Sequence, residues 1–160
     1  MKKCFVFFLL LLVTNSCQWL TDSSDKSALE KHFDIPDDAE MIAYDGFPTM
    51  VGFGQREGLN ISAKYLLSNE DMNEWIKNMQ TKGLKKLPID PECKSKLWFK
   101  DKLIPTETEN GYYYCKTAGD DVLNATETRS CDEVDNLNDI IFAILDTEKK
   151  ELSVIVTSGY

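Results

Sequence analysis

The alternation of apolar and polar residues along the chain predicts several strands. Between residues 59 and 67 every second residue is apolar, which is the period of a strand with one buried and one solvated face. The same alternation recurs over residues 152–157. Residues 140–145 are apolar at every position, so we expect a central strand there. With shorter strands at 41–44 and 112–117, the pattern predicts a sheet of about five strands.

Residues 69–82 show the helical period instead. Apolar side chains recur at i, i+3, i+4 and i+7 over residues 72–79. Ser68, followed by Asp71 three residues later, resembles a capping box, and Gly83 suits the end of a helix. These features predict an amphipathic helix over 69–82 whose tryptophan and methionine stripe packs into the core.

The remaining segments carry weaker patterns. Residues 27–33 are expected to form a short helix. Residues 84–110 hold three of the five prolines and should be mostly loop, and residues 118–137 read as an acidic loop. The elements together predict an α+β domain, in which an antiparallel sheet of about five strands packs against one main amphipathic helix.

The N-terminus has the layout of a secretory signal peptide. Two lysines follow Met1, residues 4–13 are uninterruptedly apolar, and residues 14–16 are small and polar. The apolar run is about half of the roughly 20 residues that a membrane-spanning helix requires. The pattern therefore predicts export without a permanent transmembrane span.

Ser16 followed by Cys17 resembles the lipobox of bacterial lipoproteins, although Thr14 stands where that family prefers leucine. In the family, the signal is removed before a cysteine that then carries the lipid. The resemblance implies a signal peptide at 1–16, a lipid anchor and tether at 17–25, and a single domain at 26–160. Gln18 after the cysteine implies an outer-membrane lipoprotein that faces the periplasm. Ordinary signal peptidase cutting at the same bond is the alternative.

The net negative charge of the chain limits the kinds of molecule that we expect it to bind. The chain has 27 acids against 18 bases and a net charge of −9, and loss of the two lysines in the signal makes it −11. An acidic surface repels phosphate backbones and anionic lipid headgroups, which disfavours nucleic acid and leaves the lipid as the only link to the membrane. We expect a basic protein partner, facing acids of the 118–139 loops. These acids are Asp120, Asp121, Asp132, Glu133 and Asp135.

The cysteine count predicts one disulfide. Cys4 leaves with the signal and Cys17 carries the lipid, so Cys93, Cys115 and Cys131 remain to oxidise after export. We favour Cys115 with Cys131, and Cys93 with Cys115 is the alternative. Without lipid on Cys17, two bridges could form.

The sequence contains no catalytic constellation. His32 is the only histidine and is expected at the surface, no G-x-S-x-G segment is present, and the cysteines are too far apart along the chain for a zinc motif. The acidic loop lacks the spacing of a calcium-binding EF-hand. We therefore expect no enzyme activity, no cofactor and no metal.

Two further segments are candidates for partner contacts. Residues 82–102 hold seven lysines, interrupted by Trp98 and Phe99, and are expected either to pack against the protein's own acidic face or to contact a partner. Residues 112–114 are three consecutive tyrosines, of which alternation sends at least one to each face of a sheet.

These features favour a cell-envelope lipoprotein that acts as a protein-binding module. Within that class, a periplasmic immunity protein or an inhibitor of a basic toxin or wall hydrolase fits the acidity, because opposite charge speeds association. Two alternatives stay open, namely an envelope hydrolase with paired carboxylates and a structural or assembly lipoprotein.

Overall fold

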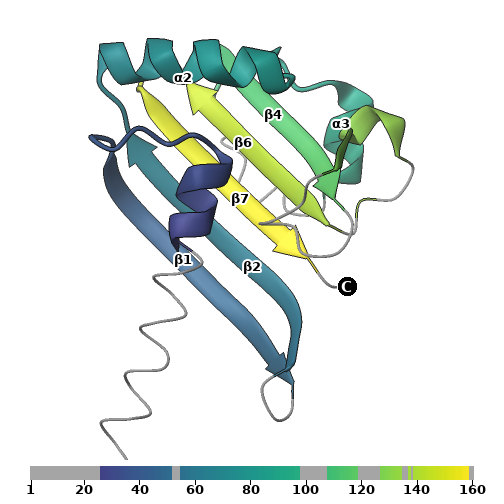
Figure 1. The fold of residues 1–160 in the computed structure, drawn as a ribbon. Coiled ribbons are helices and arrows are strands. Elements are labelled where there is room, and N and C mark those ends of the chain that lie inside the picture. Colours follow the sequence, from purple (N-terminus) through teal and green to yellow (C-terminus); the bar gives the residue numbers. More distant parts are fainter. Residues whose placement is uncertain are drawn as a thin grey trace, which may run out of the picture.

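A seven-stranded antiparallel sheet forms the centre of the molecule, with strand order β1-β2-β7-β6-β4-β3 and β5 also paired with β4 (Figure 1). The structure is a computed structural model that describes residues 26–51, 55–97, 108–118, 127–134, 137 and 139–158. The strands are β1 (Glu40–Val51), β2 (Gln55–Leu66), β3 (Lys85–Lys86), β4 (Gly111–Ala118), β5 (Thr128–Ser130), β6 (Ile140–Asp146) and β7 (Glu151–Ser158). The helices are residues 26–32, α2 (Asn69–Lys82), α3 (Pro91–Lys96) and the 3-10 turn η2 (Cys131–Glu133).

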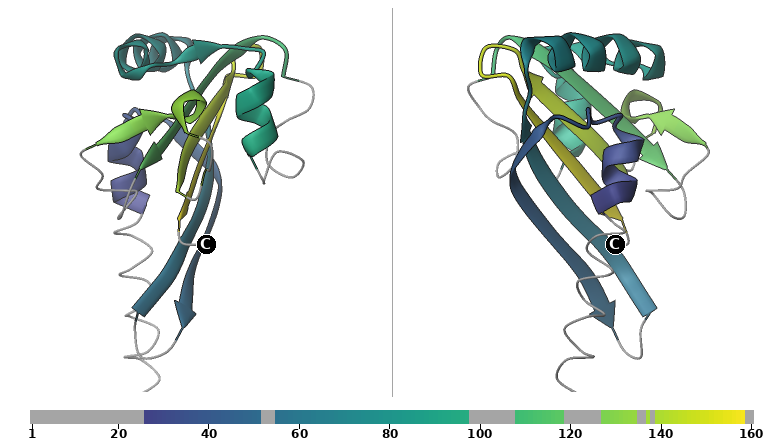
Figure 2. Two further views of the ribbon diagram at one scale, coloured as in Figure 1. Left: turned by 90° about the vertical axis from the view of Figure 1, so that its right-hand side faces the viewer. Right: turned by 60° about the vertical axis from the view of Figure 1, so that its left-hand side comes forward.

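Each face of the sheet carries its own core. On one face, α2 and the helix at 26–32 pack over β2, β7 and β6. On the opposite face, α3 and η2 cover β4 and β6. Figure 2 shows the helix at 26–32 and α3 on opposite sides of the sheet. Because β6 lies between β4 and β7 and is covered on both faces, every residue from Ile140 to Asp146 is buried, as expected for a central strand.

The predicted helix over 69–82 is confirmed with those bounds. Ser68 Oγ accepts a hydrogen bond from the Asp71 N–H at 3.1 Å, and Asp71 Oδ2 accepts one from the Ser68 N–H at 3.3 Å, so the capping box is complete. Gly83 ends the helix in the left-handed region with φ 102°. Trp75 and Met79 point into the core and are fully buried.

β1 and β2 form a long hairpin whose far end extends beyond the rest of the sheet (Figure 1). β2 pairs with β7 only from Leu59 to Leu66, so its residues 55–58 pair with β1 alone. A register shift between Met41 and Ala43 marks a bulge at Ile42, near the start of β1. β1 is an edge strand of this sheet.

The sheet has seven strands, whereas about five were expected. Two short helical elements, α3 and η2, accompany α2 and the helix at 26–32. β3 and α3 lie within residues 84–110, which were expected to be mostly loop, and β5 lies in the expected acidic loop. α3 begins because Asp90 Oδ1 accepts hydrogen bonds from two backbone N–H groups of its first turn, at 2.9 and 3.2 Å, and Pro91 suits the first helical position. Residues 119–126 lie outside the described part of the chain.

The N-terminal predictions concern residues that the structure does not describe. The signal peptide, Cys17 and the tether fall within residues 1–25. None of the helices in the described ranges has the length and apolar character needed to cross a membrane.

Candidate functional site

An exposed apolar patch lies where the β1–β2 hairpin joins the rest of the domain. Met41, Ile42 and Leu66 are 36, 46 and 39 % exposed, and they are the large hydrophobic side chains that lie exposed within the described residues. Leu66 pairs with Glu40 across the two strands, and Met41 pairs with Tyr65. Directly paired residues share a face of the sheet and successive residues alternate, so Met41 and Leu66 lie on opposite faces of the hairpin. We call the three apolar residues the β1 edge patch, which therefore includes both faces where the hairpin joins the domain.

Two of the three residues of the β1 edge patch lie on the outer strand of the sheet. Within the described chain β1 pairs with β2 alone, so nothing described lies beyond it in the plane of the sheet. The bulge places Ile42 outside the regular pairing, where its side chain is exposed. Natural proteins usually protect an edge strand with charge, a bulge or a covering element, so exposed apolar side chains beside such a strand are a candidate contact surface.

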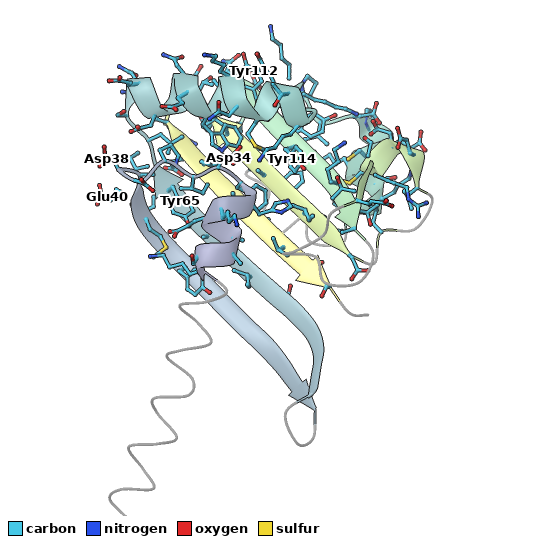
Figure 3. The ribbon with its side chains drawn as sticks, viewed as in Figure 1. Asp34, Asp38, Glu40, Tyr65, Tyr112 and Tyr114 are labelled. Carbon is cyan, nitrogen blue, oxygen red and sulfur yellow. A yellow bond between two sulfur atoms is a disulfide. The ribbon has the colours of Figure 1, made fainter. Side chains whose placement is uncertain are left out.

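An open cleft of about 510 Å³ lies between the segment that precedes β1 and the helix that follows β2, the two strands that carry the β1 edge patch. We call it the acidic cleft; it is lined by Asp34, Ile35, Pro36, Asp37, Asp38, Asp71, Glu74 and Asn78. One wall is the segment 34–38, which leads directly into β1, and the other is the N-terminal half of α2, which follows β2 after two residues. Figure 3 shows Asp38 and Glu40 together at the start of β1.

The acidic cleft favours cations. Five of its eight lining residues carry a carboxylate and none of this described lining is basic. Asp71 is held by the capping box, whereas Asp37, Asp38 and Glu74 are exposed. Like charges gathered in a concave surface raise the local concentration of positive groups and speed their arrival.

Side chains of α2 fix the loop that forms one wall of the acidic cleft. Trp75 donates its indole N–H to the backbone oxygen of Phe33 at 2.8 Å. Lys82 Nζ donates to the backbone oxygen of His32 at 3.3 Å and pairs with Asp34 Oδ2 at 2.6 Å. The middle of α2 and its C-terminal end therefore both hold this wall in place.

His32, which was expected at the surface, is half-buried beside this loop. Its ring contacts Phe33 edge to face, with 5.3 Å between the ring centroids. Burial and the nearby Lys82 lower the pKa of His32, against an opposing effect of Asp34.

The acidic loop predicted to face a partner is only partly described. Asp120, Asp121 and Asp135 lie outside the described residues. Asp132 and Glu133 are exposed on η2, and Asp132 Oδ2 is bonded to Lys85 Nζ and, at 3.2 Å, to Ser130 Oγ. The hydrogen bond from Lys85 lowers the pKa of Asp132. Asp132 therefore already has a partner within the chain, and the contact of these five acids with another protein stays a prediction.

Three lysines of the 82–102 segment pair with the protein's own acids. Besides the Lys82 and Lys85 pairs, Lys96 Nζ contacts Glu92 Oε1 at 3.1 Å. The Lys82 and Lys85 pairs reach acids outside the segment and favour the expectation that it packs against the protein's own acidic groups, whereas the Lys96 pair lies within α3. Trp98 and Phe99 lie outside the described part.

The three tyrosines of β4 face the interior of the domain. Tyr113 and Tyr114 are buried in the cores on opposite faces of the sheet, as alternation requires. Tyr112 is partly buried against the core under α2. Burial raises the pKa of Tyr114 to about 12, so its hydroxyl stays protonated.

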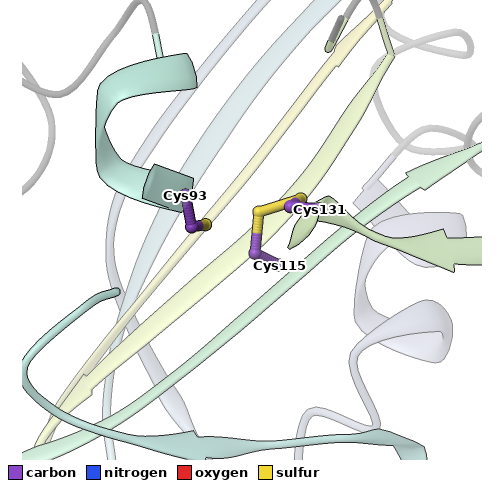
Figure 4. Close-up of side chains that lie close together, drawn as sticks. All are labelled: Cys93, Cys115 and Cys131. Carbon is purple, nitrogen blue, oxygen red and sulfur yellow. A yellow bond between two sulfur atoms is a disulfide. The ribbon is translucent and has the colours of Figure 1, made fainter. Parts of the chain in front are cut away.

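The bridge favoured from the sequence, Cys115 with Cys131, is present in the structure and joins β4 to η2. Cys93 is a free, buried thiol on α3. The three sulfur atoms lie within 4.8 Å of one another, and Figure 4 shows Cys93 directed at the bridge. The sequence marked Cys93 only as an alternative bridge partner, because spacing along the chain does not reveal a three-way contact.

Two signals in the sequence could have located the cleft and the patch. Residues 34–40 contain four acids, and residues 41–44 are apolar without alternation. Neither signal identifies a site without the strand order, because the same residues in a central strand would be buried.

No protein-family model, curated protein or solved structure matches this chain.

Proposed function

We propose that this protein is a cell-envelope lipoprotein whose domain binds a basic protein without catalysing a reaction. The observation that carries the proposal is the position of the β1 edge patch beside the acidic cleft. Protein interfaces commonly combine an apolar centre, which supplies most of the binding energy, with a charged rim. The patch offers such a centre, and the cleft offers a rim of one sign.

Charge complementarity selects the occupant. The chain carries a net charge of −9, and the acids of the cleft add a concentrated negative field next to the patch. A basic protein would be steered to this surface, whereas nucleic acid would be repelled from it. An immunity protein or inhibitor that neutralises a basic toxin or wall hydrolase is the subtype that we propose.

The envelope location rests on the lipobox-like segment and on the oxidised bridge. Disulfides persist in exported proteins and are rare in the cytosol, so the Cys115–Cys131 bridge supports export. A fully extended tether of residues 17–25 would reach about 30 Å at most. The domain would therefore meet its partner close to the membrane surface.

Replacing Cys17 by serine is expected to release the protein from the membrane fraction, because the lipid would be the only anchor. Wild-type and variant chains are expressed in a Gram-negative host, fractionated, and labelled with radioactive palmitate. We expect label and membrane association for the wild type alone. A wild-type chain that is found soluble in the periplasm and unlabelled would show that the lipoprotein assignment is wrong.

A photo-crosslinking residue in place of Ile42 is expected to give one adduct with a basic protein in cells of the source organism. The yield should fall several-fold when Asp38→Asn and Glu74→Gln weaken the acidic cleft. Adducts are resolved by electrophoresis and identified by mass spectrometry. The same crosslinker in place of Lys94, exposed on α3 on the other side of the sheet, should not give this adduct.

A matched pair of substitutions distinguishes partner contact at the acidic cleft from contact at the predicted acidic loop. Glu127→Gln with Glu133→Gln removes the same two charges near η2 and should leave the Ile42 adduct unchanged. If this pair abolishes the adduct and the cleft pair does not, the partner contacts the loop and the cleft assignment is wrong. An absent adduct, or one with an acidic protein, would overturn the proposed function.

A further inference from the structure

Three cysteines from three elements meet on the face of the sheet opposite α2. Cys93 comes from α3, Cys115 from β4 and Cys131 from η2, and their sulfur atoms lie within 4.8 Å of one another (Figure 4). All three are buried in the same apolar cluster. A free thiol packed against a disulfide is the arrangement from which thiol–disulfide exchange begins.

Side-chain contacts hold the three elements together around the sulfur atoms. Lys96 on α3 donates to the backbone oxygen of Val134, just after η2, at 3.0 Å. Lys85 on β3 pairs with Asp132 on η2. Leu97, at the end of α3, is fully buried in the same cluster as the cysteines. These contacts and the burial of Leu97 therefore keep α3 and η2 close together, with Cys93 next to the bridge.

We propose that the three cysteines form an internal thiol–disulfide exchange site in which Cys93 is the nucleophile toward the Cys115–Cys131 bridge. In the step, the Cys93 thiolate attacks Cys131 Sγ, the Cys93–Cys131 bond forms, and the Cys115–Cys131 bond breaks. The bonding pair leaves on Cys115, which takes up the proton that Cys93 released. Attack on Cys115 Sγ is the equivalent step, with Cys131 as the leaving group. Neither step needs an external oxidant or reductant.

The exchange would change which elements are covalently joined. The observed bridge ties η2 to β4, whereas a Cys93–Cys131 bridge would tie η2 to α3. A Cys93–Cys115 bridge would leave η2, and with it Asp132 and Glu133, without a covalent link. The site is on the opposite face from α2 and the acidic cleft, so the exchange is independent of the proposed partner contact.

Burial and charged neighbours determine the fraction of molecules in which Cys93 is a thiolate. Burial, together with Asp132 and Asp90 and against the opposing effects of Lys85 and Lys96, raises the pKa of the Cys93 thiol to about 11. The Tyr113 hydroxyl also faces this group. Because only the thiolate attacks, roughly one molecule in 10⁴ would be competent at pH 7, and the rate should rise about tenfold per pH unit until the pKa is reached.

The exchange is tested by mapping free thiols in the folded, oxidised full-length chain. The protein is incubated at pH 7 or pH 9, quenched with acid, alkylated and digested without reductant. At pH 9 we expect part of the alkyl label on Cys115 or Cys131, and at pH 7 slower transfer toward the same distribution. Label that stays on Cys93 alone at both pH values would overturn the proposal.

Cysteine variants test the same site without dependence on rate. Cys115→Ser should be isolated with a Cys93–Cys131 bridge, and Cys131→Ser with a Cys93–Cys115 bridge. Cys93→Ser should retain the observed bridge and show no free thiol among these three positions. Two free thiols in both of the first variants, after air oxidation of folded protein, would also contradict the exchange site.

Charge variants distinguish exchange at this site from unfolding. Asp132→Asn should speed the transfer several-fold because it removes a negative neighbour of the Cys93 thiolate, and Lys85→Gln should slow it. Lys85→Arg keeps the positive charge and should restore the wild-type rate. Equal rates in all four proteins would show that exchange proceeds through unfolded chains and not in the folded cluster.

Discussion

Replacing Trp75 by alanine is expected to lower the free energy of unfolding by about 3–5 kcal/mol. The indole is fully buried in the core under α2, so truncation would leave a large cavity that the packed sheet cannot close. It would also leave the backbone oxygen of Phe33 without the donor that now lies 2.8 Å away. Both losses act on the same helix and add to one another.

Urea unfolding followed by circular dichroism measures the effect. Trp75→Phe is the matched control, because it keeps much of the buried ring and removes the N–H, and should cost about 1–3 kcal/mol. Ile76→Ala removes a neighbouring, only partly buried side chain of α2 and should cost less than the alanine variant at 75. Equal midpoints for wild type and Trp75→Ala would contradict the central place of this residue in the core.

Trp75 also connects the core to the proposed binding surface. Its hydrogen bond holds Phe33, the residue directly before the wall of the acidic cleft, and the same helix supplies Asp71 and Glu74 to the opposite wall. The apolar stripe of α2 thus sets the position of both walls. A defect in this stripe would disturb the proposed partner contact even where the domain stays folded.

The sequence predicted those parts of the fold whose signals are local. α2 has its period, its capping box and its terminal glycine within 16 residues, and the structure gives it the bounds expected. The apolar runs that became β6 and β7 were equally clear, because central strands bury one or both faces along their length.

The missed elements are those that tertiary contacts create. β3 has two residues and β5 has three, so neither is long enough to show alternation. Both exist because β4 offers its remaining edge to them. α3 has six residues, begins at a proline and is fixed by burial of Cys93 and Leu97, none of which produces a periodic pattern.

The candidate sites could not be predicted without the strand topology, because they too depend on tertiary contacts. The acidic cleft joins the segment around Asp38 to α2 residues such as Asp71, and the two are brought together only by the hairpin between them. The sequence favours the bridge between Cys115 and Cys131 because it closes the segment between them, which contains glycine and aspartate. The position of Cys93 beside it depends on α3, which the sequence did not predict.

Removing the bridge is expected to be the second large effect. The Cys115→Ala, Cys131→Ala double variant should lose about 3 kcal/mol, because the 16-residue separation that the bridge closes would regain its freedom in the unfolded chain. The double variant is required because Cys93 could replace either partner in a single variant. Cys93→Ala is the control, since it keeps the bridge and should lose only the packing of one small buried side chain.

Urea unfolding without reductant measures the difference in stability between the double variant and the Cys93→Ala control. The slope of the unfolding transition gives a second, independent measure of the missing bridge. The unbridged chain exposes more surface when it unfolds, so its dependence on urea should be steeper than that of the Cys93→Ala control. Reduction of the wild-type protein should move its midpoint toward that of the double variant. A double variant as stable as the control would mean that packing of η2 and α3 against β4 and β6 holds this face without the covalent link.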